Sequence, residues 1–313
     1  MMKAPHIPFP AGIPGYADLQ VNGYVGVGFT SPELTADGFK RATESILKAG
    51  AAFFLPTICT APLDLYRRNI GIISSCIDSE GWRRQIPGVH IEGPFVSPLP
   101  GAVGSHRVEF VRPLDADFID SLGPLVRMVT IAAELPGAEE FIRHETARGV
   151  VVSLGHQMAG HDEIFRAAAA GAKALTHLGN AIPPKIDRHH NPVWAGLACD
   201  DLTAMMITDG FHLPPDVIKA FIRCKGVDKL IVTSDLAGVA GLPPGYIHRI
   251  DGNDVILEPN GRLSCPGTGM LAGSASPIAR CMDHLASLGL LTEEELAKVG
   301  YHNAVKLIGY EKA

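Results

Sequence analysis

Residues 138–178 read AEEFIRHETARGVVVSLGHQMAGHDEIFRAAAAGAKALTHL, and the fold assignment starts from the pattern in this stretch. An amphipathic segment at 138–148 leads into the apolar run 149–154, which begins with glycine. The next amphipathic segment, 162–169, leads in the same way into 174–178. Glycine directly after a helical segment is typical of a helix C-cap. Short apolar runs that alternate with helices predict parallel strands covered on both faces.

The same alternation extends through most of the 313 residues. The predicted strands are residues 13–21, 52–58, 88–92, 126–132, 149–154, 174–178, 202–207 and 229–234. Eight strand–helix units predict an α/β fold that closes into a (β/α)8 TIM barrel instead of an open sheet. We expect residues 1–313 to form this single catalytic domain. Turns rich in Pro, Asn and Gly predict a β-hairpin excursion at 242–264, and two helices within 276–307 close the chain.

Charge and composition exclude several classes of protein. Lys and Arg number 27 against 33 Asp and Glu, so the net charge of −6 gives no basic surface for nucleic acid. No apolar run approaches the ~18 residues of a membrane-spanning helix, and no apolar signal core follows the first residues. The six cysteines are scattered without a Cys-x-x-Cys pair, which favours reduced thiols packed as small apolar side chains. We therefore expect a cytoplasmic protein that binds neither nucleic acid nor a membrane.

Polar residues follow the predicted strands, at the end of a parallel barrel where active sites form. They are Gln20, Asn22, Thr57, Glu92, Glu134, His156, His177, Asp209, His212 and Asp235. Any one of them could be a strand end that meets solvent, but a carboxylate and two imidazoles among them indicate more. Glu92, His156 and His177 form a three-ligand set for Zn²⁺ or another divalent ion, with an open position for water. Asp235 on the last strand could then transfer the proton, which is the arrangement of metal-assisted hydrolysis.

Several segments in order carry a family resemblance. They are PGYADLQVNG (14–23), FLPT (54–57), GVHIEGPF (88–95), GAVGSH (101–106), SLGH (153–156), THLGNA (176–181), TDGFH (208–212) and VTSD (232–235). The sequence resembles the N-acetylglucosamine-6-phosphate deacetylases of the amidohydrolase superfamily. The His-x-Glu-Gly-Pro and Thr-His-x-x-Asn-Ala segments are specific to this family, and the similarity extends in register from about residue 12 to 309.

The resemblance implies a metal-dependent amidohydrolase that hydrolyses N-acetylglucosamine 6-phosphate to glucosamine 6-phosphate and acetate. It implies that Glu92, His156 and His177 bind the metal ion. It also implies that Asp235 acts as general base and then as general acid, and that His106 polarises the acetyl carbonyl. The resemblance further implies that Asn180, Ala181 (through its backbone) and His212 bind the substrate, and we expect Gln20, Arg188 and His190 to contribute.

Gln20 and Asn22 occupy positions where many amidohydrolases carry the two histidines of a His-x-His metal pair. Neither amide side chain is a good ligand for a transition metal, so we expect one divalent ion per subunit. Zn²⁺ is the expected ion, although Fe²⁺ and Mn²⁺ also accept a Glu-His-His set. The family's usual assembly implies a homodimer that acts on a small amino sugar, with the phosphate-pairing arginine supplied across the subunit interface.

Three departures from the family pattern bear on these expectations. The family's small β-sandwich domain, built from both ends of the chain, is expected to be missing or much reduced. Leu-Gly-Asn-Ala at 178–181 replaces Leu-Tyr-Asn-Ala and removes an aromatic wall of the pocket. His190 lies in the segment that holds the family's phosphate-pairing arginine, and Arg188 could reach the same anion. Two alternatives stay open: deacylation of another N-acyl molecule, with or without phosphate, and a non-catalytic sugar-binding or regulatory barrel.

Overall fold

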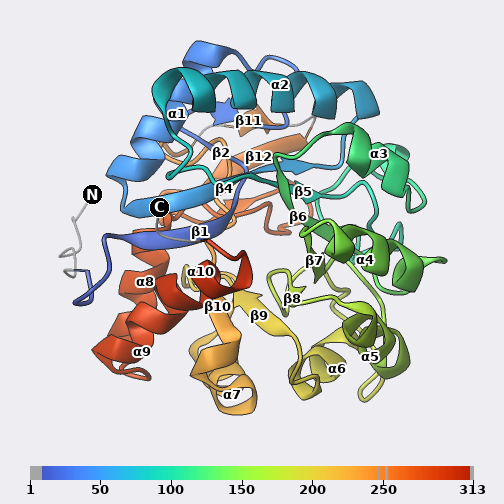
Figure 1. Ribbon diagram of the computed structural model, residues 1–313. Coiled ribbons are helices and arrows are strands. Elements are labelled where there is room, and N and C mark those ends of the chain that lie inside the picture. Colours follow the sequence, from blue (N-terminus) through green and yellow to red (C-terminus); the bar gives the residue numbers. More distant parts are fainter. Residues whose placement is uncertain (1–8, 246, 251–252, 311–313) are drawn as a thin grey trace.

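The computed structural model describes residues 9–245, 247–250 and 253–310. Its centre is a barrel of eight parallel strands whose order in the sheet follows the sequence (Figure 1). The strands are β1 (Tyr16–Val21), β4 (Ala51–Cys59), β5 (Val89–Glu92), β6 (Val126–Ile131), β7 (Val151–Leu154), β8 (Ala174–Leu175), β9 (Thr203–Met206) and β10 (Leu230–Val232). The predicted barrel of parallel strands alternating with helices is therefore confirmed.

The first and last strands of the barrel are joined by a buried carboxylate as well as by backbone. Just beyond the two strands, the Asn22 backbone N–H donates a hydrogen bond to Leu236 O at 2.8 Å. On β1, Asp18 accepts hydrogen bonds from Thr233 Oγ1 at 2.8 Å, from the Ser234 backbone N–H at 3.0 Å and from the Ser234 hydroxyl. The side chain of Asp18 thus spans the seam between β1 and the chain that follows β10.

Replacing Asp18 by Asn is expected to change how stability depends on pH. Burial raises the pKa of Asp18 from 3.8 to about 6, although the hydrogen bonds from Ser234 and Thr233 oppose the shift. The folded protein therefore binds this proton more tightly than the unfolded chain. The resulting contribution to the free energy of unfolding is full below about pH 4 and is lost as the pH rises through about 6.

Urea denaturation at a series of pH values measures this contribution. The free energy of unfolding of wild type minus that of Asp18→Asn should fall as the pH rises from about 4 to about 6, because the asparagine does not titrate. Asp78→Asn, at an exposed carboxylate that pairs with Arg83, is the matched control for the removal of one carboxylate. A flat difference for Asp18→Asn between about pH 4 and 6 would contradict the prediction.

Helices cover the outside of the barrel (Figure 1). They are α1 (Ala36–Lys48), α2 (Leu63–Glu80), α3 (Ala116–Ser121), α4 (Ala138–Ala147), α5 (His161–Ala170), α6 (Pro192–Ala198), α7 (Pro215–Lys225), α8 (Ile278–Ser287), α9 (Glu293–Ala297) and α10 (Asn303–Leu307), with short segments η1 (Val108–Phe110), η2 (Val227–Lys229) and η3 (Lys298–His302). Side chains cap several of them. Thr35, for example, accepts a hydrogen bond from the Gly38 backbone N–H at the start of α1.

The inside of the barrel has its own apolar cluster. It consists mainly of Ala17, Leu19, Phe53, Leu55, Met128, Val151, Met205 and Ile231, which pack with Tyr301 and Ala304 from the C-terminal helices. Figure 1 shows α10 in front of the barrel strands. These side chains fill the interior, so the functional groups gather at the carboxyl ends of the strands.

Two regions differ in detail from the sequence prediction. The region 242–264 contains β11 (Ile247–Ile250), β12 (Asn253–Leu257) and β13 (Leu263–Ser264), which form a three-stranded antiparallel sheet. The second of the two predicted C-terminal helices is divided into α9, the π-helical η3 and α10. Among the described residues, no helix is long and apolar enough to cross a membrane.

Candidate functional site

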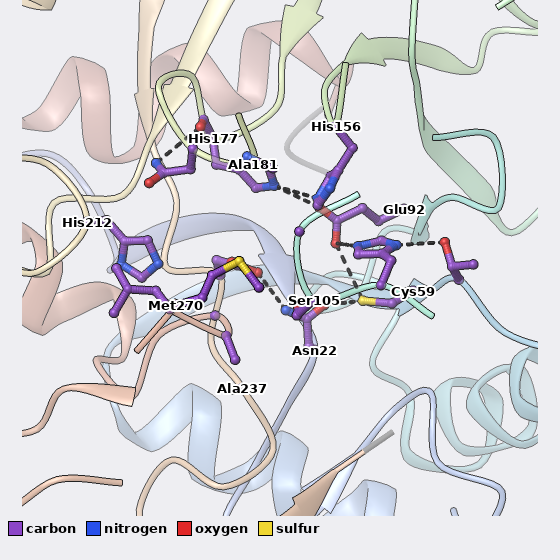
Figure 2. Close-up of a pocket in the computed structure, with 18 of the residues that line it drawn as sticks. Asn22, Cys59, Glu92, Ser105, His156, His177, Ala181, His212, Ala237 and Met270 are labelled. Atoms are coloured by element: carbon purple, nitrogen blue, oxygen red, sulfur yellow. Dashed lines mark hydrogen bonds and ion pairs between the residues drawn. The ribbon is translucent and has the colours of Figure 1, made fainter. Parts of the chain in front are cut away.

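The predicted metal ligands meet at the carboxyl ends of three strands. Glu92 is the last residue of β5, and His156 and His177 each lie two residues beyond β7 and β8. The backbone φ is +51° at His156, +32° at His177 and +50° at Asp235, which follows β10. Left-handed backbone is uncommon for residues other than glycine and is concentrated at functional sites. Here the chain turns at these residues directly after each strand, and Glu92, His156 and His177 come together (Figure 2).

Glu92, His156 and His177 place three ligand atoms at the corners of a small triangle. Glu92 Oε1 lies 3.2 Å from His156 Nε2 and 3.0 Å from His177 Nε2, and the two nitrogens are 3.1 Å apart. Ligand atoms at about 2.0–2.1 Å from a tetrahedral zinc ion are about 3.3 Å from one another, close to these separations. One cation between these three atoms would accept a lone pair from each of them. The donor set therefore fits a divalent metal ion.

Neighbouring groups orient two of these ligands. His156 Nδ1 lies 3.0 Å from the Ala102 backbone oxygen, which can only accept, so Nδ1 carries a proton and Nε2 is the nitrogen that can give its lone pair to an ion. Gln20 on β1 donates from Nε2 to Glu92 Oε1 at 2.6 Å and to Asp235 Oδ1 at 3.1 Å. Gln20 was expected to contact substrate, but it is fully buried and its amide instead holds two carboxylates.

Glu92 and Asp235 have pKa values shifted in opposite directions. Burial alone would raise the pKa of Glu92, but hydrogen bonds from His156 and His177 and their positive charge hold it well below its usual range. Burial, followed by the negative charge of Glu92, raises the pKa of Asp235 to about 7. Asn22 Nδ2 donates to Asp235 Oδ1 at 2.6 Å. One carboxylate thus stays ionised while the other can exchange a proton near neutral pH, as general acid–base chemistry requires.

His106 approaches Glu92 from the loop that follows β5. Its Nδ1 lies 2.6 Å from Thr60 Oγ1, and its Nε2 lies 3.8 Å from Glu92 Oε2. Burial, followed by the positive charge of His156, lowers the pKa of His106 to about 3, so the ring is neutral. Gly93 makes room for this contact, because a Cβ there would lie 2.2 Å from Thr60 Oγ1.

A pocket of about 290 Å³ opens onto these groups (Figure 2). Ligand sites span about 300 to 1,000 Å³, so this volume suits a small molecule. The predicted site residues that line it are Glu92, His106, His156, His177, Asn180, Ala181, His212 and Asp235. Eight of the predicted residues, from four strand ends and three loops, therefore share one cavity.

The side chain of Asp209 holds His212 in this pocket. His212 Nδ1 lies 2.8 Å from Asp209 Oδ2, and Asp209 Oδ1 accepts the backbone N–H groups of Phe211 and His212 at 2.9 Å. Burial opposes the ionisation of Asp209, but the hydrogen bonds from His212 and from the Phe211 backbone N–H, together with the charge of His212, lower the pKa of the carboxyl group. The loop after β9 therefore presents an imidazole oriented by an ionised carboxylate.

Arg188 and His190 lie outside this pocket. Both are exposed on the segment between β8 and α6, beside Trp194, whose indole N–H donates to Arg188 O at 3.0 Å. Trp194 is itself exposed, with 56% of its surface open to solvent. The arginine that does line the pocket is Arg107, whose Nε donates to Glu109 Oε1 at 2.8 Å.

Three residues that line the pocket were not among the predicted site residues: Cys59, Thr60 and Arg107. The strand predicted to end at residue 58 extends to Cys59, so its carboxyl end lies beyond Thr57. Thr57 is fully buried and accepts a hydrogen bond from the Val21 backbone N–H at 3.1 Å. The sequence contains a signal for this longer strand, because no proline or glycine follows Thr57 before Pro62.

No family model matches the chain, but its curated relatives and the similar solved structures carry the name of one family. The chain is 34% identical over 320 residues to the N-acetylglucosamine-6-phosphate deacetylase of Bos taurus, covering 96% of this chain and 75% of the relative. The Homo sapiens protein of the same name is 34% identical over 317 residues with the same coverage. The Bacillus subtilis protein is 28% identical over 310 residues, covering 95% of this chain and 75% of the relative.

Solved structures give the same result. A Mycobacterium smegmatis N-acetyl-D-glucosamine-6-phosphate deacetylase, an aspartate-to-alanine mutant in complex with N-acetyl-D-glucosamine-6-phosphate, has a TM-score of 0.86 and 27% identity and covers 95% of this chain and 77% of its own. The Thermotoga maritima enzyme has a TM-score of 0.85 and 26% identity, with 95% and 78% coverage. Similarity at this level over three quarters of the relatives' length, together with the same barrel, establishes the family. The chain belongs to the N-acetylglucosamine-6-phosphate deacetylases of the amidohydrolase superfamily.

Proposed function

We propose that this chain hydrolyses the N-acetyl amide of N-acetylglucosamine 6-phosphate and releases acetate and glucosamine 6-phosphate. The observation that carries the proposal is the position of Asp235 in one pocket with the ligand atoms of Glu92, His156 and His177. Relatives named for this deacetylase share most of the chain, and one solved relative is described in complex with the same sugar phosphate.

Glu92, His156 and His177 are proposed to hold one divalent ion per subunit, and Zn²⁺ is the ion that we propose. When bound, such an ion polarises a carbonyl group and lowers the pKa of water. Gln20 and Asn22 occupy the positions of the second-ion histidines in other amidohydrolases. Both direct their amide N–H groups to Asp235 Oδ1, at 3.1 Å and 2.6 Å, which supports a single ion at this position.

Asp235 is the proposed base and acid of the reaction. Both amide donors bind its Oδ1, so Oδ2 remains for proton transfer. Oδ2 accepts a proton from the attacking water as the water oxygen bonds to the acetyl carbon. The same proton then passes to the amide nitrogen as the C–N bond breaks. The water oxygen ends in the acetyl product and the transferred proton on the released amine. The second water proton leaves when the acetic acid ionises to acetate and is taken up by the amine or by solvent, so atoms and charges balance.

His106 is the proposed donor to the acetyl carbonyl oxygen. Because its ring is neutral, one nitrogen carries a proton and the other a lone pair. If the Thr60 hydroxyl donates to Nδ1, the proton lies on Nε2, the nitrogen nearer to Glu92. A donor fixed in this way stabilises the negative charge that develops on the carbonyl oxygen.

The phosphate group is proposed to bind at the end of the pocket formed by Asn180, the Ala181 backbone and His212. In one chain, Arg188 is exposed outside this pocket. We propose that the chain forms a homodimer in which Arg188, and His190 beside it, complete the phosphate site of the neighbouring subunit. The exposed indole of Trp194 next to Arg188 supports a protein contact at this place.

Arg188→Ala is expected to raise KM for N-acetylglucosamine 6-phosphate about 10- to 100-fold, because a bidentate charge-assisted contact to phosphate is lost. KM for unphosphorylated N-acetylglucosamine should stay within about twofold. Arg107→Ala is the matched control, since Arg107 lines the pocket of its own chain and already pairs with Glu109. Steady-state kinetics on both sugars decides: a phosphate-selective effect of Arg107→Ala alone would exclude Arg188.

Acetate release by the purified, metal-loaded chain tests the proposal. One observation favours a second candidate, deacylation of a different N-acyl substrate. Position 179 is a glycine with φ of +90°, where a Cβ would lie 3.1 Å from Leu213, so the pocket has no aromatic side chain at this position. The assay therefore compares the sugar with and without phosphate and with longer acyl chains. Faster turnover of another acyl compound would favour the second candidate. No turnover of any compound by a fully metallated protein would favour a non-catalytic sugar-binding barrel.

A further inference from the structure

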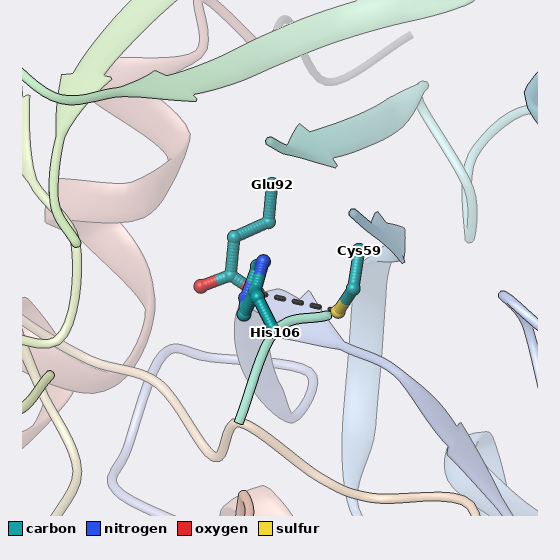
Figure 3. Close-up of side chains that lie close together, drawn as sticks. All are labelled: Cys59, Glu92 and His106. Carbon is teal, nitrogen blue, oxygen red and sulfur yellow. Dashed lines mark hydrogen bonds and ion pairs between the residues drawn. The ribbon is translucent and has the colours of Figure 1, made fainter. Parts of the chain in front are cut away.

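A second group of possible ligand atoms lies beside the first. Cys59 is the last residue of β4 and pairs in register with Glu92, the last residue of β5. His106 comes from the loop that follows β5, and Figure 3 shows the three side chains gathered around one point. Cys59 Sγ lies 3.5 Å and His106 Nε2 lies 3.8 Å from the same atom, Glu92 Oε2. One ligand atom from each residue falls within 4.8 Å of the other two.

The two oxygens of Glu92 serve different groups. Oε1 lies 3.2 Å and 3.0 Å from the Nε2 atoms of His156 and His177. Oε2 is the oxygen near Cys59 and His106. A carboxylate divided in this way can bridge two cations, and paired ions in enzymes lie about 3.5–4 Å apart. The cluster of Cys59, His106 and Glu92 Oε2 is thus a separate set of donors that shares only the carboxylate with the first set.

The chemistry of this second set selects a particular kind of ion. Thiolate, imidazole and carboxylate are the ligand types that Zn²⁺ takes in proteins. A thiolate favours Zn²⁺ and other thiophilic ions over Mg²⁺, Ca²⁺ and Mn²⁺, which prefer oxygen. Asn22 Oδ1, 3.3 Å from Cys59 Sγ, adds an oxygen donor at the edge of the cluster.

The surroundings of His106 permit both of its roles. Thr60 Oγ1, 2.6 Å from Nδ1, is a hydroxyl that can either donate or accept. When Thr60 donates, Nε2 carries the proton and can bind a carbonyl oxygen. When Thr60 accepts, Nδ1 carries the proton and the lone pair of Nε2 is free for an ion, as in metal-binding histidines. The side chains of His106 and Glu92 are 5% and 3% exposed, so both are held in place by packing.

We propose that Cys59, His106 and Glu92 Oε2 form a second cation site, specific for a thiophilic ion such as Zn²⁺, whose occupation switches the enzyme off. Binding forms the Sγ–metal bond and releases the thiol proton to solvent. It takes the lone pair of His106 Nε2 and fills the pocket beside Asp235 with a cation. The binding step is independent of the proposed function, whereas the loss of activity rests on it.

Metal titration of the protein with one equivalent of ion bound tests the binding step. Wild type should take up a second equivalent of Zn²⁺ or Cd²⁺, and Cd²⁺ should produce the ultraviolet charge-transfer band of a Cd–thiolate bond. Mn²⁺ should give neither result. Cys59→Ser should lack the band and bind the second equivalent at least about 100-fold more weakly, beyond the ~10–100-fold typical of losing an outer-shell partner. Cys224→Ser, at an exposed cysteine, is the matched control and should behave as wild type.

Activity is then measured with and without excess Zn²⁺ within each protein, so that any effect of the substitution on the basal rate cancels. Wild type and Cys224→Ser should lose at least about 100-fold, the scale for removing one donor to a developing oxyanion. Cys59→Ser and Cys59→Ala should lose less than about threefold. A second equivalent bound equally well by both Cys59 variants, or no second equivalent in wild type, would overturn the proposal. A second equivalent in a chain without deacetylase activity would overturn only the proposed function.

Discussion

Asp235→Asn is expected to lower the single-turnover rate of deacetylation by about 10⁴-fold while the protein still folds and binds one metal ion. Loss of a general acid or base costs about 10²–10⁴-fold, and here one carboxylate is proposed to serve in both halves of the reaction. The amide has nearly the same shape but can neither accept the proton of the attacking water nor deliver it to the leaving nitrogen. The effect should therefore lie at the upper end of the range.

The environment of Asp235 explains why folding and metal binding should survive this substitution. Its Oδ1 accepts hydrogen bonds from Gln20 and Asn22, and the amide oxygen of asparagine can accept both. Removing the negative charge also relieves its repulsion with Glu92, which together with burial raises the pKa of Asp235 to about 7. The free energy of unfolding of the variant should accordingly equal or exceed that of wild type at pH 8, where Asp235 is ionised.

Metal content, substrate Kd and single-turnover rate on one preparation check this prediction. Kd should change by less than about tenfold, because the carboxylate acts mainly in the transition state. Glu134→Gln is the matched control: Glu134 also follows a barrel strand, but it accepts the Met158 backbone N–H at 2.8 Å and lies outside the pocket lining. Near-normal turnover by Asp235→Asn would remove Asp235 from the mechanism, and loss of the metal ion would make it a ligand.

The barrel and the ligand cluster could be predicted from the sequence because both follow from local patterns. Apolar runs and helical periodicity place each strand, and the parallel arrangement brings all carboxyl ends to the same end of the barrel. Glu92, His156 and His177 are each within two residues of a strand end, so their meeting needs no further information. The left-handed backbone at His156 and His177, in contrast, could not be predicted, because neither position is a glycine.

The parts that sequence analysis did not predict depend on where loops and strand ends lie in space. Arg188 lies on a loop whose path no periodicity determines, and the structure leaves it outside its own pocket. Cys59 lies one residue beyond the predicted strand, an error in the usual range for element boundaries. Side chains alternate along a strand, so Thr57 and Cys59 lie on the same face. When the strand extends to residue 59, Cys59 takes the place of Thr57 as the last side chain on that face. Cysteine's frequent burial as a small apolar side chain also favoured a structural interpretation.

His177→Ala is expected to remove the metal ion and the activity together. The substitution deletes one corner of the triangle in which Nε2 lies 3.0 Å from Glu92 Oε1 and 3.1 Å from His156 Nε2. Two donors remain where a catalytic zinc site needs three, so the metal content after dialysis should fall below about 0.1 equivalent per chain. The rate of acetate release should fall in proportion to the metal lost.

A buried histidine of the same barrel separates loss of a ligand from loss of packing. His90 lies two residues before Glu92, is fully buried, and bonds Leu19 O at 3.0 Å and Thr130 Oγ1 at 2.7 Å. His90→Gln should lower the free energy of unfolding by about 1–3 kcal/mol, because a buried polar partner is left unsatisfied. It should nevertheless retain one equivalent of metal and most of the activity, whereas His177→Ala should retain neither. Elemental analysis, urea denaturation and acetate release on both variants distinguish the two effects. A fully metallated, active His177→Ala protein would show that Glu92 and His156 do not need His177 to hold the ion.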